Sequence, residues 1–141
     1  MNARTPAKRE AIVGCYLRVA AAGDDAENQL RMQRTLCRMA GGINELGEAT
    51  EFVDVGDSGL TAKRPGLQRL LRMARQGQIS HVIVADPYRL ARSPLLRIQL
   101  IRELRSNGVS VLVAADREGD FEAVHAQLME IATCLTERRA A

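Results

Sequence analysis

The chain has 141 residues, 46% of them hydrophobic and 26% charged, which fits one compact domain with a buried core. Its net charge is +3, and all but two of its 20 basic residues (Lys8 and Lys63) are arginine. This bias is compatible with a nucleic-acid partner, and equally with an arginine-rich genome. Aromatic residues make up 3% and tryptophan is absent, which argues against a single-strand binder that stacks bases on aromatic rings.

Residues 1–10 are polar and basic and predict a flexible N-terminal arm, whereas residues 11–141 predict one domain. The apolar run after the arm is interrupted by Arg18, so we expect neither a signal peptide nor a membrane span. The alternation of apolar patterns then predicts strands and helices in turn. Strands are expected at 11–19, 49–55, 81–85 and 109–114. Helices are expected at 26–40, 65–76 and 94–106, and from about 121 to the C-terminus.

Local signals mark the ends of these helices. Asp24 and Asp25 are candidate caps of the first helix, and Gly41 with Gly42 is expected to end it. Pro65 suits the first turn of the second helix, and Ser93 can cap the third. The alternation predicts an α/β fold: a mostly parallel, four- to five-stranded open sheet with helices on both faces and a long C-terminal helix.

The last helix carries an apolar stripe, formed by Phe121, Val124, Leu128, Ile131 and Leu135. Such a stripe packs either on its own domain or against a second copy of the chain.

The thiols and imidazoles are too scattered to bind a metal. They are Cys15, Cys37, Cys134, His81 and His125, and they have no zinc-site spacing. Neither a G-x-G-x-x-G nor a P-loop motif is present, so we expect no nucleotide cofactor and no metal. An odd number of isolated cysteines predicts reduced thiols in a cytoplasmic protein.

Several arginines lie where ligands gather in open α/β sheets, near the carboxyl ends of the strands. They are Arg18, Arg64, Arg89 and Arg92. Arginines that converge in a cleft predict a bound anion such as phosphate. The alternative is that each pairs with a nearby carboxylate such as Asp54, Asp57 or Asp86.

The same arginines lie in three motifs that resemble serine recombinases, the resolvase/invertase family. Tyr16-Leu17-Arg18-Val19 is similar to Y-x-R-V-S, and Glu27-Asn28-Gln29 to the E-x-Q that follows. Residues 54–59 resemble D-x-G-x-S-G, residues 64–67 R-P-x-L, and residues 89–92 the R-L-x-R of D-R-L-x-R. The motifs keep their order and spacing over about residues 11–139.

The resemblance implies a serine that attacks a DNA phosphodiester to form a phosphoseryl link. It implies that Arg18, Arg64, Arg89 and Arg92 bind the scissile phosphate, and it matches Asp54 to the acid before S-G. The nucleophile's position is held by Ala20, however, which has no nucleophilic atom. Tyr88 stands in place of the acid before R-L-x-R, and Asp24 in place of a glutamine.

These departures favour a non-catalytic, dimerising or regulatory recombinase-like domain that keeps an arginine pocket for DNA phosphate. Its partners would be the DNA backbone and a second copy, or a related recombinase, bound through the last helix. The alternative is the catalytic domain of a genuine site-specific recombinase in an inactivated or truncated form, or with Tyr88 as a substitute nucleophile. A third possibility is an α/β interaction domain whose arginines pair internally. We expect no C-terminal DNA-binding domain, since the chain stops at Arg138-Arg139-Ala140-Ala141.

Overall fold

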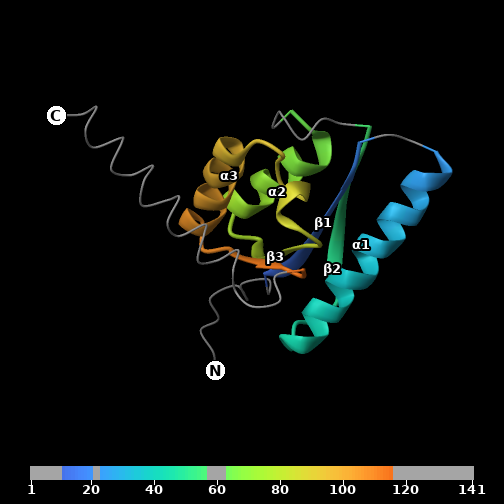
Figure 1. Ribbon diagram of the computed structural model, residues 1–141. Helices are drawn as coiled ribbons and strands as arrows, with labels where there is room; N and C mark the ends of the chain where they lie inside the picture. Colours follow the sequence, from blue (N-terminus) through green and yellow to red (C-terminus); the bar gives the residue numbers. More distant parts are fainter. Residues whose placement is uncertain (1–10, 21–22, 57–62, 116–141) are drawn as a thin grey trace, which may run out of the picture.

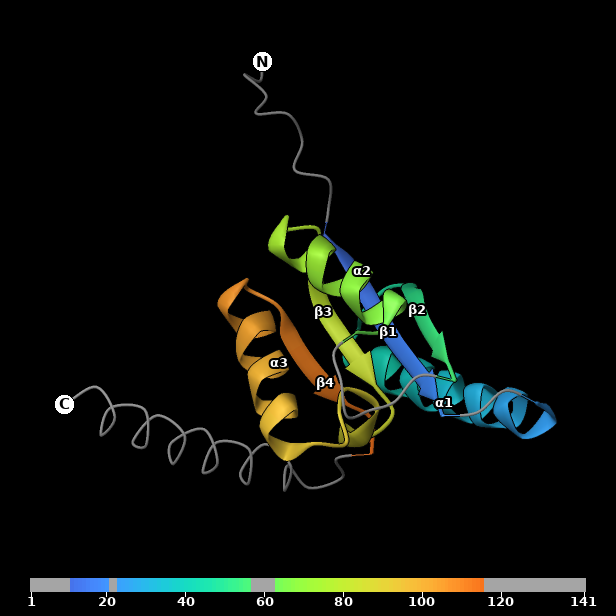
Figure 2. The same cartoon turned by 90° about the horizontal axis from the view of Figure 1, so that it is seen from above.

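Parallel strands form the centre of the structure, a computed structural model that describes residues 11–20, 23–56 and 63–115. Within these ranges the strands are β1 (Ile12–Val19), β2 (Ala49–Val55), β3 (Ile79–Val84) and β4 (Ser110–Val113). They lie side by side in the order β2-β1-β3-β4, and every pairing is parallel (Figure 2). Each crossover between neighbouring parallel strands contains a helix, as the predicted α/β fold requires.

The helices cover both faces of this sheet, so the predicted fold class is confirmed. They are α1 (Asp24–Ile43), α2 (Pro65–Arg75), α3 (Pro94–Ser106) and the short 3₁₀ helix η1 (Pro87–Arg89). Helix α1 packs on one face, and α2 and α3 pack on the other (Figure 1). The predicted C-terminal helix and its apolar stripe lie outside the described residues. Within those residues, none of the helices combines the length and apolarity that a membrane crossing needs.

Alternation along β1 builds a core on each side of the sheet. Tyr16 points toward α2 and α3, where it packs in a core with Phe52 and Leu70. Cys15 and Leu17 point the other way, toward α1. β1 is central and buried along almost its whole length, so its polar residues must find partners inside the protein.

The two ends of α1 differ from the sequence prediction. Helix α1 begins at Asp24, and Gly23, with φ of +129°, holds the cap position without a side-chain cap bond, so capping by Asp24 and Asp25 is wrong. The helix also continues through Gly41 and Gly42 to Ile43. Gly41 is buried at the contact with β3, where a Cβ would lie 3.5 Å from the Ile83 side chain, an ordinary van der Waals distance. Packing against the sheet therefore outweighs the low helix propensity of glycine.

The other two predicted helix starts are confirmed. Pro65 opens α2, and the Ser93 hydroxyl accepts a hydrogen bond of 3.3 Å from the backbone N–H of Leu96 at the start of α3.

Candidate functional site

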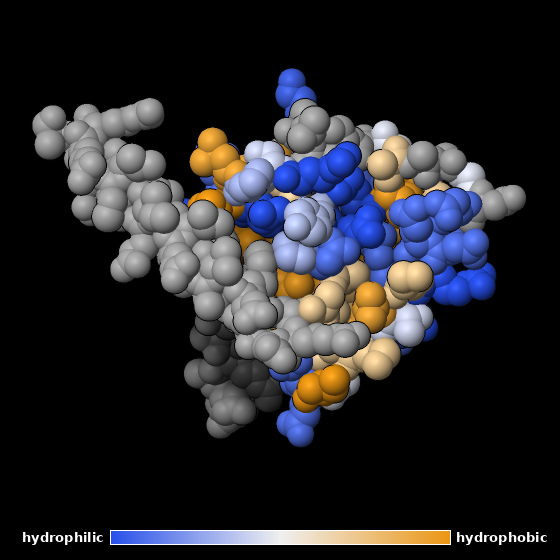
Figure 3. Space-filling model, viewed as in Figure 1, coloured by the Kyte–Doolittle hydropathy of each residue, from blue (hydrophilic) through white to orange (hydrophobic). Residues whose placement is uncertain are grey.

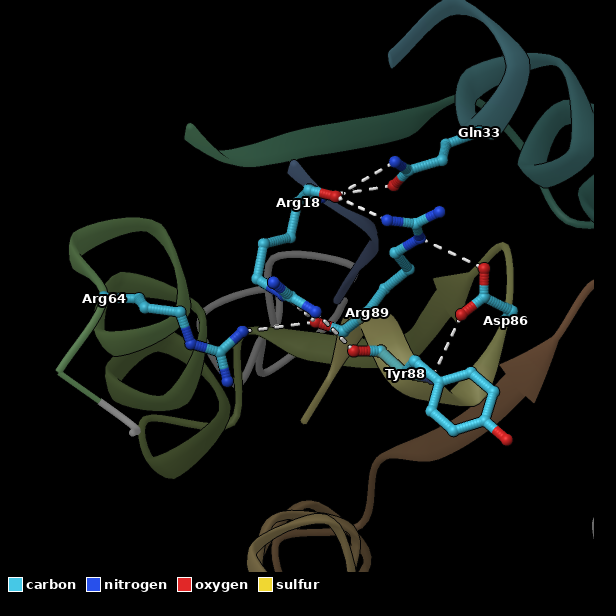
Figure 4. Close-up of polar contacts among 6 residues, drawn as sticks. All are labelled: Arg18, Gln33, Arg64, Asp86, Tyr88 and Arg89. Carbon is cyan, nitrogen blue, oxygen red and sulfur yellow. Dashed lines mark hydrogen bonds and ion pairs between the residues drawn. The ribbon is translucent and has the colours of Figure 1, made fainter. Parts of the chain in front are cut away.

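Polar residues gather at the carboxyl ends of the strands. In Figure 3, which looks toward these strand ends, hydrophilic residues gather in the middle and upper part of the molecule. Three arginines from distant segments meet here: Arg18 at the end of β1, Arg64 just before α2, and Arg89 in η1 (Figure 4). The predicted convergence of these segments is therefore present in the fold.

Arg18 connects β1 to the segment that follows β3. Its side chain is 3% exposed. Nε donates a hydrogen bond of 3.1 Å to the carbonyl of Arg89, and Nη2 donates one of 2.7 Å to the carbonyl of Tyr88. A buried guanidinium thus fixes the backbone of η1.

Arg64 contacts the same backbone from the other side, and its side chain is fully buried at 0% exposure. Nη1 donates to the Tyr16 hydroxyl (2.9 Å) and to the Arg89 carbonyl (3.2 Å), and Nη2 donates to the carbonyl of Leu90. Its guanidinium also lies over the Tyr16 ring, 5.6 Å from the centroid. Arg64 therefore connects α2, β1 and η1.

Asp54 is the buried carboxylate next to these cations. One oxygen accepts a hydrogen bond from the N–H of Gly66 (2.7 Å), and the other accepts from the N–H of Leu67 (2.9 Å) and from the Tyr16 hydroxyl (2.7 Å). Asp54 thereby satisfies N–H groups at the start of α2 and places a negative charge at its positive end. Burial and the bond to Asp54 raise the pKa of Tyr16 well above its ordinary value, so the hydroxyl stays neutral.

Asp86 organises η1 from its N-terminal end. One oxygen accepts from the N–H of Tyr88 (3.0 Å), and the other accepts from Nε of Arg89 (3.1 Å). Arg89 in turn donates from Nη1 to the carbonyl of Arg18 (3.1 Å). Of the carboxylate partners that the sequence suggested for the arginines, the structure thus shows an ion pair between Asp86 and Arg89.

Gln33 is a residue of the candidate site that the sequence analysis did not identify. It lies in the buried stripe of α1 with 2% exposure. Its side-chain oxygen accepts from the Arg18 N–H (3.2 Å), and its side-chain nitrogen donates to the Arg18 carbonyl (3.0 Å). β1 thus gains a hydrogen-bonded partner on the face that α1 covers. A lone amide interrupting an apolar stripe was the available signal, because such a group must be satisfied internally.

An open pocket of about 230 Å³ lies beside this network. Its lining residues are Arg18, Ala20, Gln29, Asp86, Tyr88, Arg89 and Arg92. Ala20 and Arg92 are exposed, and Ala20 presents only a methyl group to the pocket. The pocket therefore combines guanidinium groups with a position that has no nucleophile.

Positive charge exceeds negative charge around this pocket. Among the described residues that line the pocket, three guanidinium groups (Arg18, Arg89, Arg92) face one carboxylate (Asp86). Burial lowers the pKa of Arg18, and the positive charges of Arg64, Arg89 and Arg92 lower it further. An anion in the pocket would relieve this repulsion.

The predicted site residues thus fall into two groups. Arg18, Arg89, Arg92, Ala20 and Tyr88 line the pocket together. Arg64 and Asp54 are absent from its lining and lie in the buried network behind it.

Tyr88 is exposed, and its side chain points away from the guanidinium groups of Arg18 and Arg64 (Figure 4). Its ring instead lies 5.3 Å from the guanidinium carbon of Arg97. This orientation does not favour Tyr88 as a substitute nucleophile. In the described part of the chain, no group of three or more His, Cys, Asp or Glu side chains is arranged to hold a metal ion.

Comparison with known proteins assigns this arrangement to a family. The family model described as "Resolvase, N terminal domain" matches residues 13–138, which is most of the chain. The chain therefore belongs to the resolvase N-terminal domain family, a class related to DNA recombination.

Curated relatives agree with this assignment over part of their length. "Putative resolvase R771" of Acanthamoeba polyphaga mimivirus is 29% identical over 118 residues, which cover 82% of this chain and 55% of the relative. "Putative DNA recombinase" of Bacillus subtilis is 35% identical over 65 residues, which cover 46% of this chain and 13% of the relative. The chain thus spans about half of the length of the viral relative and a small part of the bacterial one.

Solved structures share the fold. The N-terminal catalytic domain of TP901-1 integrase superposes with a TM-score of 0.74 at 21% identity, covering 91% of this chain and 96% of that chain. A serine recombinase from Sulfolobus solfataricus superposes with a TM-score of 0.59 at 26% identity, covering 92% of this chain and 85% of that one.

Proposed function

We propose that this chain is a recombinase-like domain that binds the phosphate backbone of DNA in its arginine pocket without cutting the DNA. The observation that carries the proposal is the pocket itself, where guanidinium groups surround Ala20. A covalent phosphoseryl mechanism needs a hydroxyl at that position, and a methyl group cannot supply one. Binding and cleavage are thus separable in this site.

The arginines would divide the work of phosphate binding. Arg18 and Arg64 are buried and hydrogen-bonded to backbone carbonyls of residues 88–90, so they shape the pocket. Arg92 is exposed on the pocket lining, and Arg89 beside it is partly exposed. A phosphate would contact these two, and preorganised guanidinium groups suit its oxygens.

The cleavage half of the proposal is tested with supercoiled plasmid DNA. We expect the unmodified chain to give no covalent protein–DNA adduct and no nicked product. An adduct on the unmodified chain would contradict the proposal, and its mapped position would identify the nucleophile. An adduct at Tyr88 would support the substitute-nucleophile alternative.

The binding half is tested by thermal unfolding with added sulfate or phosphate. A ligand at 100 times its dissociation constant stabilises a protein by about 2.7 kcal/mol, so the melting temperature should rise with anion concentration. Arg92→Ala should remove most of this rise. Arg102→Ala is the matched control, because Arg102 is exposed on α3 and does not line the pocket. Melting that does not depend on the anion, or that changes equally in both variants, would refute the pocket as an anion site.

We also propose that the chain self-associates through the predicted stripe Phe121, Val124, Leu128, Ile131 and Leu135, which lies outside the described residues. Charged residues at both Leu128 and Ile131 should then give a monomer in sedimentation experiments, with the fold checked by circular dichroism. The proposal is contradicted if the unmodified chain sediments as a monomer at roughly tens of micromolar, a concentration on the order of an ordinary weak dissociation constant.

A further inference from the structure

A second cavity, of about 300 Å³, lies on the face of the sheet that α1 covers, under the C-terminal half of this helix. Two thiols line it: Cys15 from the middle of β1 and Cys37 from α1. The cavity also touches Gly41, Gly42 and Gly47, whose missing side chains help to leave the space open.

The two thiols come from the two sides of the contact between helix and sheet. Both belong to the same buried core and are 3% exposed, and neither is in a disulfide. Each thiol also shifts the pKa of the other. The two thiols thus line one cavity, and a small molecule there would meet both of them.

Charged groups at the cavity distinguish the two thiols. Arg34 and Arg38 line it, and Glu51, next to Cys15 in the sheet register, pairs with Arg34 at 2.6 Å. Hydrogen bonding by Cys37 lowers the pKa of Cys15, against the raising effects of burial and of the Glu51 charge, and the charges of Arg34 and Arg38 lower it further. The same hydrogen bonding and burial raise the pKa of Cys37. Cys15 thus loses its proton more readily than Cys37, and the thiolate is the nucleophilic form of cysteine.

We propose that Cys15 and Cys37 are an oxidative modification site, at which a small hydroperoxide entering the cavity converts the two thiols into a disulfide between β1 and α1. The Cys15 thiol loses its proton, and the thiolate attacks one oxygen of hydrogen peroxide. The O–O bond breaks, a sulfenic acid forms, and the other oxygen leaves as hydroxide, which takes up the released proton to give water. The Cys37 sulfur then attacks the Cys15 sulfur, an S–S bond forms and a second water leaves. The two thiols are oxidised by two electrons, and the peroxide is reduced by two.

A metal is a weaker candidate for this cavity. A structural zinc site uses four ligands, and the described residues offer no cluster of three potential ligands here. The carboxylate of Glu51 is also occupied by Arg34, which it binds through both oxygens at 2.6 and 3.0 Å.

The test is oxidation of the full chain with hydrogen peroxide, followed by alkylation under denaturing conditions and mass mapping. We expect a product lighter by two hydrogens, with a non-reduced peptide pair that links Cys15 to Cys37. The Cys134→Ser variant should give the same link, which would show that the disulfide forms without the third cysteine. Alkylation of both Cys15 and Cys37 after exhaustive oxidation, or a link that involves Cys134 instead, would overturn the proposal.

Single variants test the division of roles. With Cys37→Ser, dimedone should trap a sulfenic acid at Cys15, whereas with Cys15→Ser it should trap none at Cys37. Trapping at Cys37 alone would overturn the assignment of Cys15 as the attacking thiol. Arg38→Gln should slow oxidation of Cys15 several-fold, while Arg31→Gln, an exposed arginine of α1 outside the cavity lining, should leave the rate unchanged. Equal rates in both arginine variants would remove Arg38 from the proposed site.

Discussion

The Tyr16 hydroxyl connects β1 to two buried charges of the site, Asp54 and Arg64. It donates to Asp54 at 2.7 Å and accepts from Arg64 at 2.9 Å, and the side chain is completely buried. Tyr16→Phe removes this one oxygen and keeps the ring, including the face that lies under the Arg64 guanidinium. The variant therefore isolates the two hydrogen bonds from the packing.

The expected loss of stability follows from the partners that remain. A hydrogen bond to a charged group contributes about 1.5–3 kcal/mol, and a buried polar group left without its partner bears its desolvation cost. Asp54 keeps the N–H groups of Gly66 and Leu67, and Arg64 keeps the carbonyls of Arg89 and Leu90. We therefore expect a loss of about 2–4 kcal/mol in the free energy of unfolding, or roughly 6–16 °C in Tm for a domain of this size.

Urea unfolding followed by circular dichroism measures this loss, with an unchanged m-value as the check that the same surface unfolds. Tyr88→Phe is the matched control, because the same oxygen is removed from an exposed side chain. It should change stability by less than about 0.5 kcal/mol. Equal stabilities of the Tyr16→Phe variant and the unmodified chain would refute the reasoning that this hydroxyl holds the buried charges.

Further predictions concern the same network. The pKa of Tyr16 is raised in the folded state above its ordinary value of 10.0, so its contribution is complete below about pH 10 and is lost as the pH rises further. In urea unfolding, the unmodified chain should therefore lose stability more steeply than Tyr16→Phe does as the pH rises above about 10. Gly66→Ala should destabilise the protein by about 1–3 kcal/mol, because its Cβ would lie 2.9 Å from the Val53 carbonyl and 3.0 Å from the Asp54 carboxylate. Gly47→Ala, whose Cβ would have no neighbour within 4 Å, should stay within about 0.5 kcal/mol of the unmodified chain in the same experiment.

Periodicity was sufficient to predict most of the fold. The predicted strand at 49–55 matches β2, and the predicted helices at 65–76 and 94–106 match α2 and α3 to within a residue. These segments have a clear apolar period and a recognisable end signal such as Pro65 or Ser93. The prediction was wrong at both ends of α1. Gly23 holds the cap position instead of Asp24 or Asp25, and the helix continues through Gly41 and Gly42 along the sheet to Ile43.

The sequence predicted the location of the site better than the contacts of its residues. The rule for open α/β sheets put Arg18, Arg89 and Arg92 at one edge, and the structure has them around one pocket. The sequence could not show that Arg64 is buried behind that pocket, because burial depends on how α2 packs against β1 and η1. It also left Gln33 without a role, since the amide's partner is the backbone of a strand fifteen residues away.

This network changes what the retained arginines imply. Four cations kept in a site without its nucleophile suggest at first that an anion still binds there. Arg18 and Arg64, however, donate to the carbonyls of Tyr88, Arg89 and Leu90, so the fold itself gives a reason to retain them. Losing either would leave buried carbonyls without these donors, with or without DNA. Arg92 is exposed, so packing of the core gives no such reason to retain it. The effect of Arg92→Ala on stabilisation by phosphate therefore distinguishes an anion site that still binds from arginines kept only for the fold.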